Sequence, residues 1–137
     1  TAGVGIGKYE EILSLIDLVL LDIKHPNREE YQKLTGQDIS ESEKFIESLN
    51  QSGKPVWIRQ VIVPGLTDSE EYLQSLNAYL KKIKNIARVD FLPYHNLGKS
   101  KYEELNIPYP YASLEAMDKV KCEELYQKFK KMYHGQL

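Results

Sequence analysis

The sequence predicts an α/β fold in which parallel strands alternate with helices. Three short apolar runs, at residues 18–23, 56–63 and 87–92, are separated by segments whose apolar residues recur at helical spacing. Strands that alternate with helices form right-handed β-α-β units and a parallel sheet. A complete eight-unit barrel needs about 250 residues, and this chain has 137. We therefore expect one domain over residues 1–137 that forms the C-terminal half of a partial, TIM-like β/α barrel.

The N-terminal part of the chain predicts a helix and then a buried strand. Residues 8–16 carry an apolar stripe at helical spacing, formed by Tyr9, Ile12, Leu13 and Ile16. The run at 18–23 is continuous, which is typical of a strand buried on both faces. If no strand precedes it, its outer edge presents unpaired backbone groups, which native proteins normally cover. The glycines of residues 1–7 lack the full spacing of a phosphate-binding loop, and we interpret them as a simple loop.

Two helices are expected between the first and second strands. Residues 27–34 form a short helix that ends at Gly36. The segment Ser40-Glu-Ser-Glu43 matches a capping box, so a second helix begins there and ends at Gly53. The buried stripe of this second helix consists of Phe45, Ile46 and Leu49.

The second and third strands enclose a long helix. The second strand, residues 56–63, is apolar except for Arg59 and Gln60. The segment Thr67-Asp-Ser-Glu70 matches another capping box and opens a helix with a long apolar stripe. This stripe consists of Tyr72, Leu73, Leu76, Tyr79, Leu80 and Ile83. The third strand, residues 87–92, comes next.

The C-terminal part of the chain is expected to hold a loop and a last helix. We interpret residues 98–107 as a loop with one helical turn, and residues 113–132 as the helix. The inward positions of this helix are Leu114, Met117, Val120, Leu125 and Phe129. Cys122 lies within it and is interpreted as core filler. Because it is the only cysteine, the chain by itself makes neither an internal disulfide nor a multi-cysteine metal site.

Composition excludes several classes of function. The formal net charge is -2 and the basic residues are spread along the chain, so we expect no nucleic-acid partner. The longest apolar stretch, residues 18–21, is far shorter than the roughly 20 residues that a bilayer requires. No signal-peptide core opens the chain. We therefore expect no membrane association and a cytoplasmic location.

Polar residues gather late in the strands or just beyond them. Asp22 and Lys24 are two residues apart in a strand and therefore project from the same face. Arg59 lies in an apolar strand and needs an anionic partner, either Asp22 or a ligand carboxylate. The third strand leads into Tyr94, His95 and Asn96. The carboxyl ends of parallel strands hold the ligand and catalytic groups of such folds, so we expect a site there.

Each candidate also has a structural alternative. Asp22 and Lys24 could form an ion pair at the end of a strand, and Arg59 could pair only with an acid of the core. His95 could be a hydrogen-bonded loop histidine. The convergence of these residues at three neighbouring strand ends favours a shared binding site over three separate structural roles.

Four segments together resemble the radical S-adenosylmethionine enzymes that activate glycyl radical enzymes. They are Leu20-Leu-Asp-Ile-Lys24, Tyr31-Gln-Lys-Leu-Thr-Gly36, Val56-Trp-Ile-Arg-Gln-Val-Ile-Val-Pro-Gly65, and Asp90-Phe-Leu-Pro-Tyr-His95 with Leu97-Gly-Lys99. The resemblance implies a partial β/α barrel whose first strands hold a [4Fe-4S] cluster in a Cys-x3-Cys-x2-Cys loop. This sequence has no such loop, and Thr1-Ala-Gly3 resembles the end of the family's Asp-Thr-x-Gly segment. We therefore expect the cluster-binding part upstream of Thr1, and we expect these residues alone to be inactive.

The resemblance also implies an activity and its partners. A 5′-deoxyadenosyl radical, generated from S-adenosylmethionine, would abstract hydrogen from a backbone glycine of a glycyl radical enzyme such as pyruvate formate-lyase. A flavodoxin or ferredoxin type protein would donate the electron. Asp22 and Lys24 match positions that contact S-adenosylmethionine or its associated cation site. Arg59 matches an arginine near the ligand carboxylate and the substrate peptide. His95 matches a histidine beside the adenosyl group. We expect these four residues to bind and position the ligand, without transferring protons.

Two other functions stay open at this point. The chain could activate a different glycyl radical enzyme, because the motifs do not identify the residues that contact the partner. It could also be a binding module without catalytic function that keeps half a barrel. Whether three cysteines are encoded upstream of Thr1 separates the enzyme from the binding module.

Overall fold

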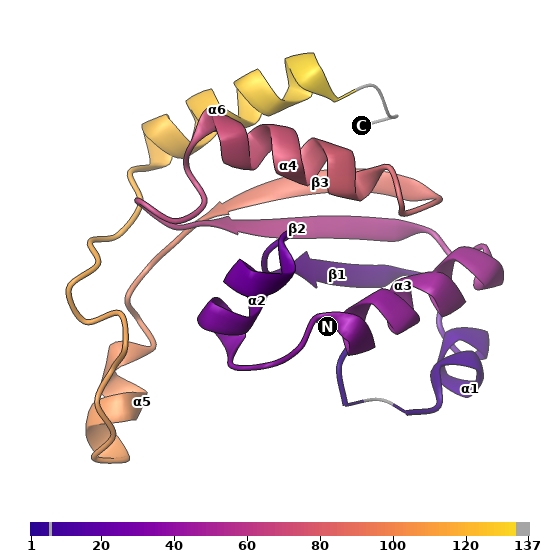
Figure 1. Cartoon of the computed structure of the whole chain (residues 1–137), viewed down its shortest axis with the longest axis horizontal. Coiled ribbons are helices and arrows are strands. Elements are labelled where there is room, and N and C mark those ends of the chain that lie inside the picture. Colours follow the sequence, from indigo (N-terminus) through magenta and orange to yellow (C-terminus); the bar gives the residue numbers. More distant parts are fainter. Residues whose placement is uncertain (6, 134–137) are drawn as a thin grey trace.

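The computed structural model describes residues 1–5 and 7–133, in which strands and helices alternate along the chain (Figure 1). β1, β2 and β3 lie side by side in that order, and both pairs are parallel. The predicted fold of parallel β/α units is therefore confirmed. The elements are α1 (Tyr9–Ser14), β1 (Val19–Ile23), α2 (Arg28–Thr35), α3 (Ser40–Ser52), β2 (Val56–Ile62), α4 (Glu70–Leu80), β3 (Ile86–Pro93), α5 (Lys99–Glu104) and α6 (Lys119–Met132).

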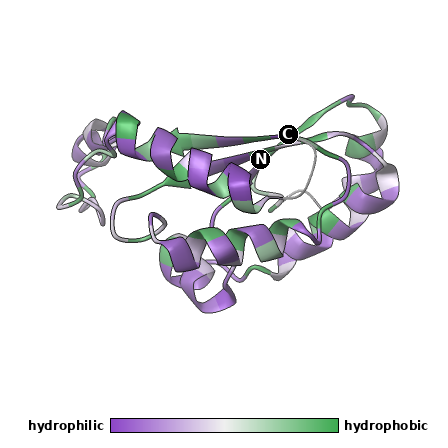
Figure 2. Cartoon of the chain, turned by 90° about the horizontal axis from the view of Figure 1, so that it is seen from above, coloured by the Kyte–Doolittle hydropathy of each residue, from purple (hydrophilic) through white to green (hydrophobic). Residues whose placement is uncertain are grey.

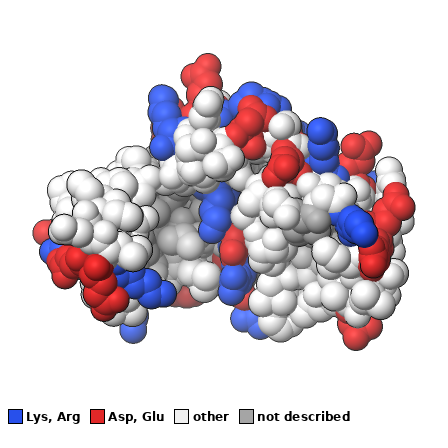
Figure 3. Space-filling model, turned by 90° about the horizontal axis from the view of Figure 1, so that it is seen from below, with Lys and Arg blue, Asp and Glu red and all other residues white. Residues whose placement is uncertain are grey.

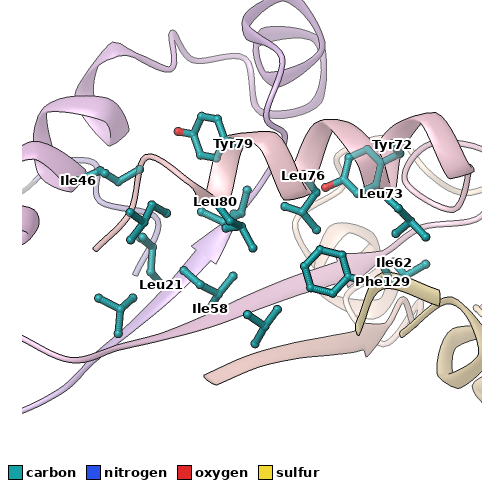
Figure 4. Packing of buried hydrophobic residues seen from close by; sticks show 14 of the residues in the cluster. Leu21, Ile46, Ile58, Ile62, Tyr72, Leu73, Leu76, Tyr79, Leu80 and Phe129 are labelled. Carbon is teal, nitrogen blue, oxygen red and sulfur yellow. The ribbon is translucent and has the colours of Figure 1, made fainter. Parts of the chain in front are cut away.

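The core lies between the helices and one face of the sheet, which we call the covered face. In the close view, side chains from α4 and Phe129 of α6 lie against Leu21 of β1 and Ile58 and Ile62 of β2 (Figure 4). Figure 2 shows hydrophobic and hydrophilic residues alternating along the helices, as expected when each helix buries one side. The apolar stripe predicted for α4 is buried throughout.

The opposite face of the sheet, which we call the open face, is only partly covered by the described residues. Leu20 is 37% exposed although its neighbour Leu21 is fully buried, and along β2 buried residues alternate with half-buried ones. The expectation that the first strand is buried on both faces is therefore wrong. The reason is that the packed helices lie on one side of the strands.

The outer edge of β1 pairs with the first residue of the chain. The Thr1 nitrogen lies 3.0 Å from the Leu20 carbonyl oxygen, to which it donates. The Asp22 N–H in turn donates to the Thr1 carbonyl at 2.8 Å. Thr1 therefore forms backbone hydrogen bonds with Leu20 and Asp22, the two neighbours of Leu21, which is the pattern of two parallel strands. As expected, the outer edge of β1 is covered in part, here by the backbone of a single residue.

The ends of α2 and α3 agree with the glycine signals. Gly36 and Gly53 follow these helices with φ of 72° and 67°, in the left-handed region that glycine adopts without strain. Asn27 caps the start of α2 by accepting hydrogen bonds from two backbone N–H groups.

Both predicted capping boxes are wrong in detail. At α3 the side chain of Asp38, not Ser40, accepts from a backbone N–H, namely that of Ser40, at 2.8 Å. At α4 the cap is Ser69, which accepts from the Tyr72 N–H. Thr67 is buried instead, where its hydroxyl accepts from the Val63 N–H and donates to the Val61 carbonyl. The turn after β2 needs that hydroxyl, so the helix begins later than the motif suggests.

The first and last helices are shorter than predicted. In α1 Ile12, expected to face inward, is 40% exposed. The last helix starts at Lys119 rather than residue 113, because Asp118 caps it by accepting from the Lys121 N–H. With this start, Val120 points outward and is exposed, whereas Leu125 and Phe129 are buried as expected.

The segment from Tyr94 to Met117 leaves the sheet and returns to it. The Met117 N–H donates to the Tyr94 carbonyl at 2.8 Å, which closes the segment at its base. The helical turn predicted within residues 98–107 is α5, and it projects from the rest of the molecule (Figure 1). Seen from below, the surface between α5 and the main body is hollowed, and basic and acidic side chains lie beside each other there (Figure 3).

Candidate functional site

The centre of the candidate site is an ion pair between two neighbouring strands. Asp22 of β1 and Arg59 of β2 are register partners, and both project from the open face. The Arg59 guanidinium donates from Nε to Asp22 Oδ1 at 2.8 Å and from a terminal nitrogen to Oδ2 at 3.2 Å. This two-bond geometry is the strong form of an arginine–carboxylate contact. The hydrogen bond to Asp22 is the main cause that raises the pKa of Arg59.

Lys24 completes the cluster from just beyond the end of β1. Its Nζ lies 3.8 Å from Asp22 Oδ2, and its side chain is partly exposed. Asp22 thus faces two cations, and Arg59 is the one that forms hydrogen bonds with it. The structure therefore brings together three of the four site residues that were predicted from the sequence. Of the two partners considered for Arg59, Asp22 is the one within the chain.

His95 is not joined to this cluster. It lies two residues beyond the end of β3 and is exposed. Among the described residues no hydrogen bond or ion pair connects its ring to the other three. Gln60 does not join them either, because it points to the covered face and is only 1% exposed.

Two further charged residues, which were not predicted from the sequence, extend the cluster across the sheet. Asp90 of β3 is the register partner of Arg59, on the side opposite to Asp22. Arg88 donates from Nε to Asp90 Oδ1 at 2.7 Å, and its guanidinium lies 5.0 Å from the centre of the Trp57 ring. Aligning the polar positions of three parallel strands could have found Asp90, since in-register residues of adjacent strands share a face.

Tyr94, the residue just after β3, belongs to a group of aromatic residues in the Tyr94–Met117 segment. Its hydroxyl lies 2.6 Å from that of Tyr109. Burial, followed by this hydrogen bond, raises the pKa of Tyr94 to about 12. Tyr111 donates to the Leu34 carbonyl at 3.1 Å, which ties the segment to the end of α2. The hydroxyls are therefore used to hold this segment in place.

The covered side also has a small cavity near the ends of the strands. Its volume is about 200 Å³, and its lining includes His25, Leu66 and Tyr111. The His25 ring packs on Tyr72 with ring centres 5.2 Å apart, and its Nδ1 accepts from the Asn27 N–H. Burial lowers the pKa of His25. This cavity is lined by residues other than those of the charged cluster.

The described residues hold no group of three or more histidine, cysteine or acidic side chains suited to a metal ion. Cys122 is buried in α6, and burial raises the pKa of its thiol, as fits core filler. None of the helices described is both long and apolar enough to span a membrane.

No family model matches the chain, but individual proteins do. The pyruvate formate-lyase-activating enzyme of Clostridium pasteurianum is 47% identical over 132 residues, which are 96% of this chain. The protein of the same name from Streptococcus mutans is 48% identical over 103 residues, or 75% of this chain. The chain is a homologue of the pyruvate formate-lyase-activating enzymes. It spans about half the length of these relatives, 56% of the first and 39% of the second.

Solved structures share its fold. A domain of the pyruvate formate-lyase-activating enzyme from Bacteroides vulgatus superposes with a TM-score of 0.68 at 15% identity, over 92% of this chain and 69% of that one. A radical SAM methyltransferase from Sphaerobacter thermophilus superposes with a TM-score of 0.60, also at 15% identity, over 96% of this chain and 36% of that one. The three parallel strands with their helices are thus a partial β/α fold that matches domains of radical SAM enzymes.

Proposed function

We propose that this chain is the C-terminal part of a glycyl-radical-enzyme activase and binds S-adenosylmethionine at the ends of its strands. The observation that carries the proposal is the meeting of Asp22, Lys24 and Arg59 on one face, at one edge of a parallel sheet. Such edges hold the ligands of parallel β/α folds. The homology to pyruvate formate-lyase-activating enzymes supports the choice of ligand and of reaction.

The side chains of the cluster have the donors and acceptors that this ligand requires. The amino-acid end of S-adenosylmethionine has a carboxylate and an ammonium group. Arginine is suited to bind a carboxylate with two hydrogen bonds, while a carboxylate such as Asp22 accepts from ammonium or hydroxyl groups. Lys24 donates to oxygen atoms of the ligand, and we assign His95 to the adenosyl end. These residues bind and orient the ligand, without moving a proton.

The chemistry that bound S-adenosylmethionine supplies in such enzymes is a 5′-deoxyadenosyl radical that takes hydrogen from a glycine of the partner. The [4Fe-4S] cluster does not fit the residues of this chain, since its one cysteine is buried in the core. We assign the cluster ligands to a part of the protein that precedes Thr1. The ladder pattern at the outer edge of β1 supports a preceding parallel strand there. The 137 residues alone are then inactive.

The partner in this proposal is a glycyl radical enzyme, with pyruvate formate-lyase preferred because of the names of the relatives. A flavodoxin or ferredoxin type protein supplies the electron. If no cysteines are encoded before Thr1, the proposed function is instead that of a binding module without catalytic activity. If they are encoded but pyruvate formate-lyase is not activated, a different glycyl radical enzyme is the partner.

The binding site is tested by measuring the affinity for S-adenosylmethionine in the protein extended upstream by its cluster-binding part. Lys24→Ala and Arg59→Ala are expected to raise the dissociation constant at least about tenfold, because each removes a charged hydrogen-bond donor. Lys44→Ala is the matched control, since Lys44 is exposed on α3, away from the cluster. Unchanged affinity in both test variants would show that the ligand binds elsewhere. Separately, an iron–sulfur chromophore reconstituted on the 137 residues alone would contradict the upstream assignment.

A further inference from the structure

We propose that Asp90 is a positioning residue that gives Arg59 a second carboxylate partner, to which the guanidinium moves when the ligand takes Asp22. This inference rests on the proposed function, because it concerns how that site becomes free. Asp90 acts on the ligand only through Arg59.

The first step is that Asp22 is already occupied. Both of its carboxylate oxygens accept hydrogen bonds from Arg59, and Lys24 approaches the same oxygen that accepts the longer bond. A ligand ammonium or hydroxyl group that binds Asp22 therefore competes with the guanidinium for the same two oxygens. Because the Arg59 side chain is partly exposed, water replaces part of the lost interaction, and a second carboxylate nearby replaces more of it.

The second step is that Asp90 stands in the right place to be that acceptor. The register places Asp22, Arg59 and Asp90 in one row across β1, β2 and β3. Adjacent strands are about 4.8 Å apart, so Arg59 has a carboxylate-bearing neighbour on either side. The charge of Asp90 contributes to the raised pKa of Arg59, after the larger effects of Asp22.

The third step is that Asp90 is held in position but not saturated. Its Oδ1 accepts from Arg88 at 2.7 Å, and Arg88 is in turn held over the Trp57 ring. Its Oδ2 accepts no hydrogen bond from any described residue, and the second terminal nitrogen of Arg59 likewise donates none. An acceptor and a donor therefore remain on neighbouring side chains of the row. Arg88 fixes Asp90 so that it can receive Arg59.

A first experiment tests the move without any ligand, in the 137-residue chain. Nitrogen NMR follows the Nε–H of Arg59 through its chemical shift and its exchange with water. Asp22→Ala removes the first partner, and we expect the Nε–H to stay protected because it now donates to Asp90. In the double variant Asp22→Ala with Asp90→Ala, we expect the shift and exchange of a solvated guanidinium. If Asp22→Ala alone already gives the solvated values, the inference is overturned.

A second experiment measures affinity for S-adenosylmethionine in the protein extended upstream by its cluster-binding part. We expect Asp90→Asn to raise the dissociation constant about tenfold, which corresponds to about 1.4 kcal/mol, and Asp90→Glu to restore most of the affinity. Asp17→Asn is the matched control, because this exposed residue precedes β1 at the opposite end of the strand. In an Arg59→Gln background, we expect Asp90→Asn to have no further effect.

The outcomes separate this inference from the proposed function. If Lys24→Ala and Arg59→Ala also leave the affinity unchanged, the proposed binding site itself is wrong. If Lys24→Ala weakens binding but Asp90→Asn does not, only the role of Asp90 is overturned. An Asp90→Asn effect of equal size in the Arg59→Gln background would indicate a purely structural role and would also overturn it.

Discussion

The two faces of the sheet differ although they are made by alternate residues of the same strands. The covered face of β2 consists of Val56, Ile58, Gln60 and Ile62, all buried. The open face of the same strand carries Trp57, Arg59 and Val61, all half-buried. The covered face contributes to folding by removing apolar area from water, whereas the open face keeps charged groups accessible. Stability and binding are therefore expected to depend on different residues, often adjacent ones.

Leu20 and Leu21 give the largest expected contrast between the faces. Leu21 is fully buried and Leu20 is 37% exposed. We expect Leu21→Ala to lower the free energy of unfolding by about 2–5 kcal/mol, since it removes apolar contacts and leaves a cavity. For Leu20→Ala we expect less than about 1 kcal/mol. Urea denaturation followed by circular dichroism measures both, and equal losses would mean that the open face is buried in solution.

The Asp22–Arg59 pair gives an effect of intermediate size. A double-mutant cycle with Asp22→Asn and Arg59→Gln is expected to show a coupling of about 1 kcal/mol in unfolding free energy, because both side chains are partly exposed. The coupling should shrink as salt concentration rises. The same cycle on Lys121 and Asp68, an ion pair between α6 and the start of α4, serves as a comparison away from the open face. A coupling of zero at low salt would contradict the pairing seen here.

The smallest effect on stability is expected at His25, which follows Lys24 but leaves β1 toward the opposite side. The His25 ring packs on Tyr72 of α4, and burial lowers its pKa below the ordinary value of 6.5. The unfolded chain therefore binds a proton more readily, so stability should fall as pH decreases below about 6.5. The loss ends once the folded protein is also protonated. His25→Gln should remove this part of the pH dependence of unfolding, and an unchanged slope would assign it to other groups.

The order of elements could be predicted from the sequence because each leaves a local signal. The stripe of α4 and the glycines after α2 and α3 identify those elements well. Which face of β1 is buried could not be predicted, because Leu18 to Leu21 are all apolar and the answer depends on where distant helices pack. The start of α6 was missed for a related reason. Met117 is buried because the chain returns to Tyr94 there, and not because it lies in a helix. From the sequence alone, its apolar side chain fits the helical stripe.

Part of the candidate site could be predicted because charged residues are unusual within a buried strand. Asp22 and Arg59 interrupt apolar runs, and their pairing follows from strand order and register. Asp90 was missed because its partner in register could be recognised only after β2 and β3 had been aligned. The assignment of His95 to the site stays a prediction, since its place beyond β3 is set by a long loop and not by a strand.

The closed base of the Tyr94–Met117 segment has a consequence for how this part of the molecule can vary. Because a backbone hydrogen bond joins its two ends, the sheet and α6 are connected whatever lies between them. Doubling the length of a flexible loop costs only about 0.6 kcal/mol in closure entropy. Insertions and deletions within α5 itself, away from His95 and the Tyr94–Tyr109 contact, should therefore be tolerated, which makes this the natural place for related chains to diverge in length.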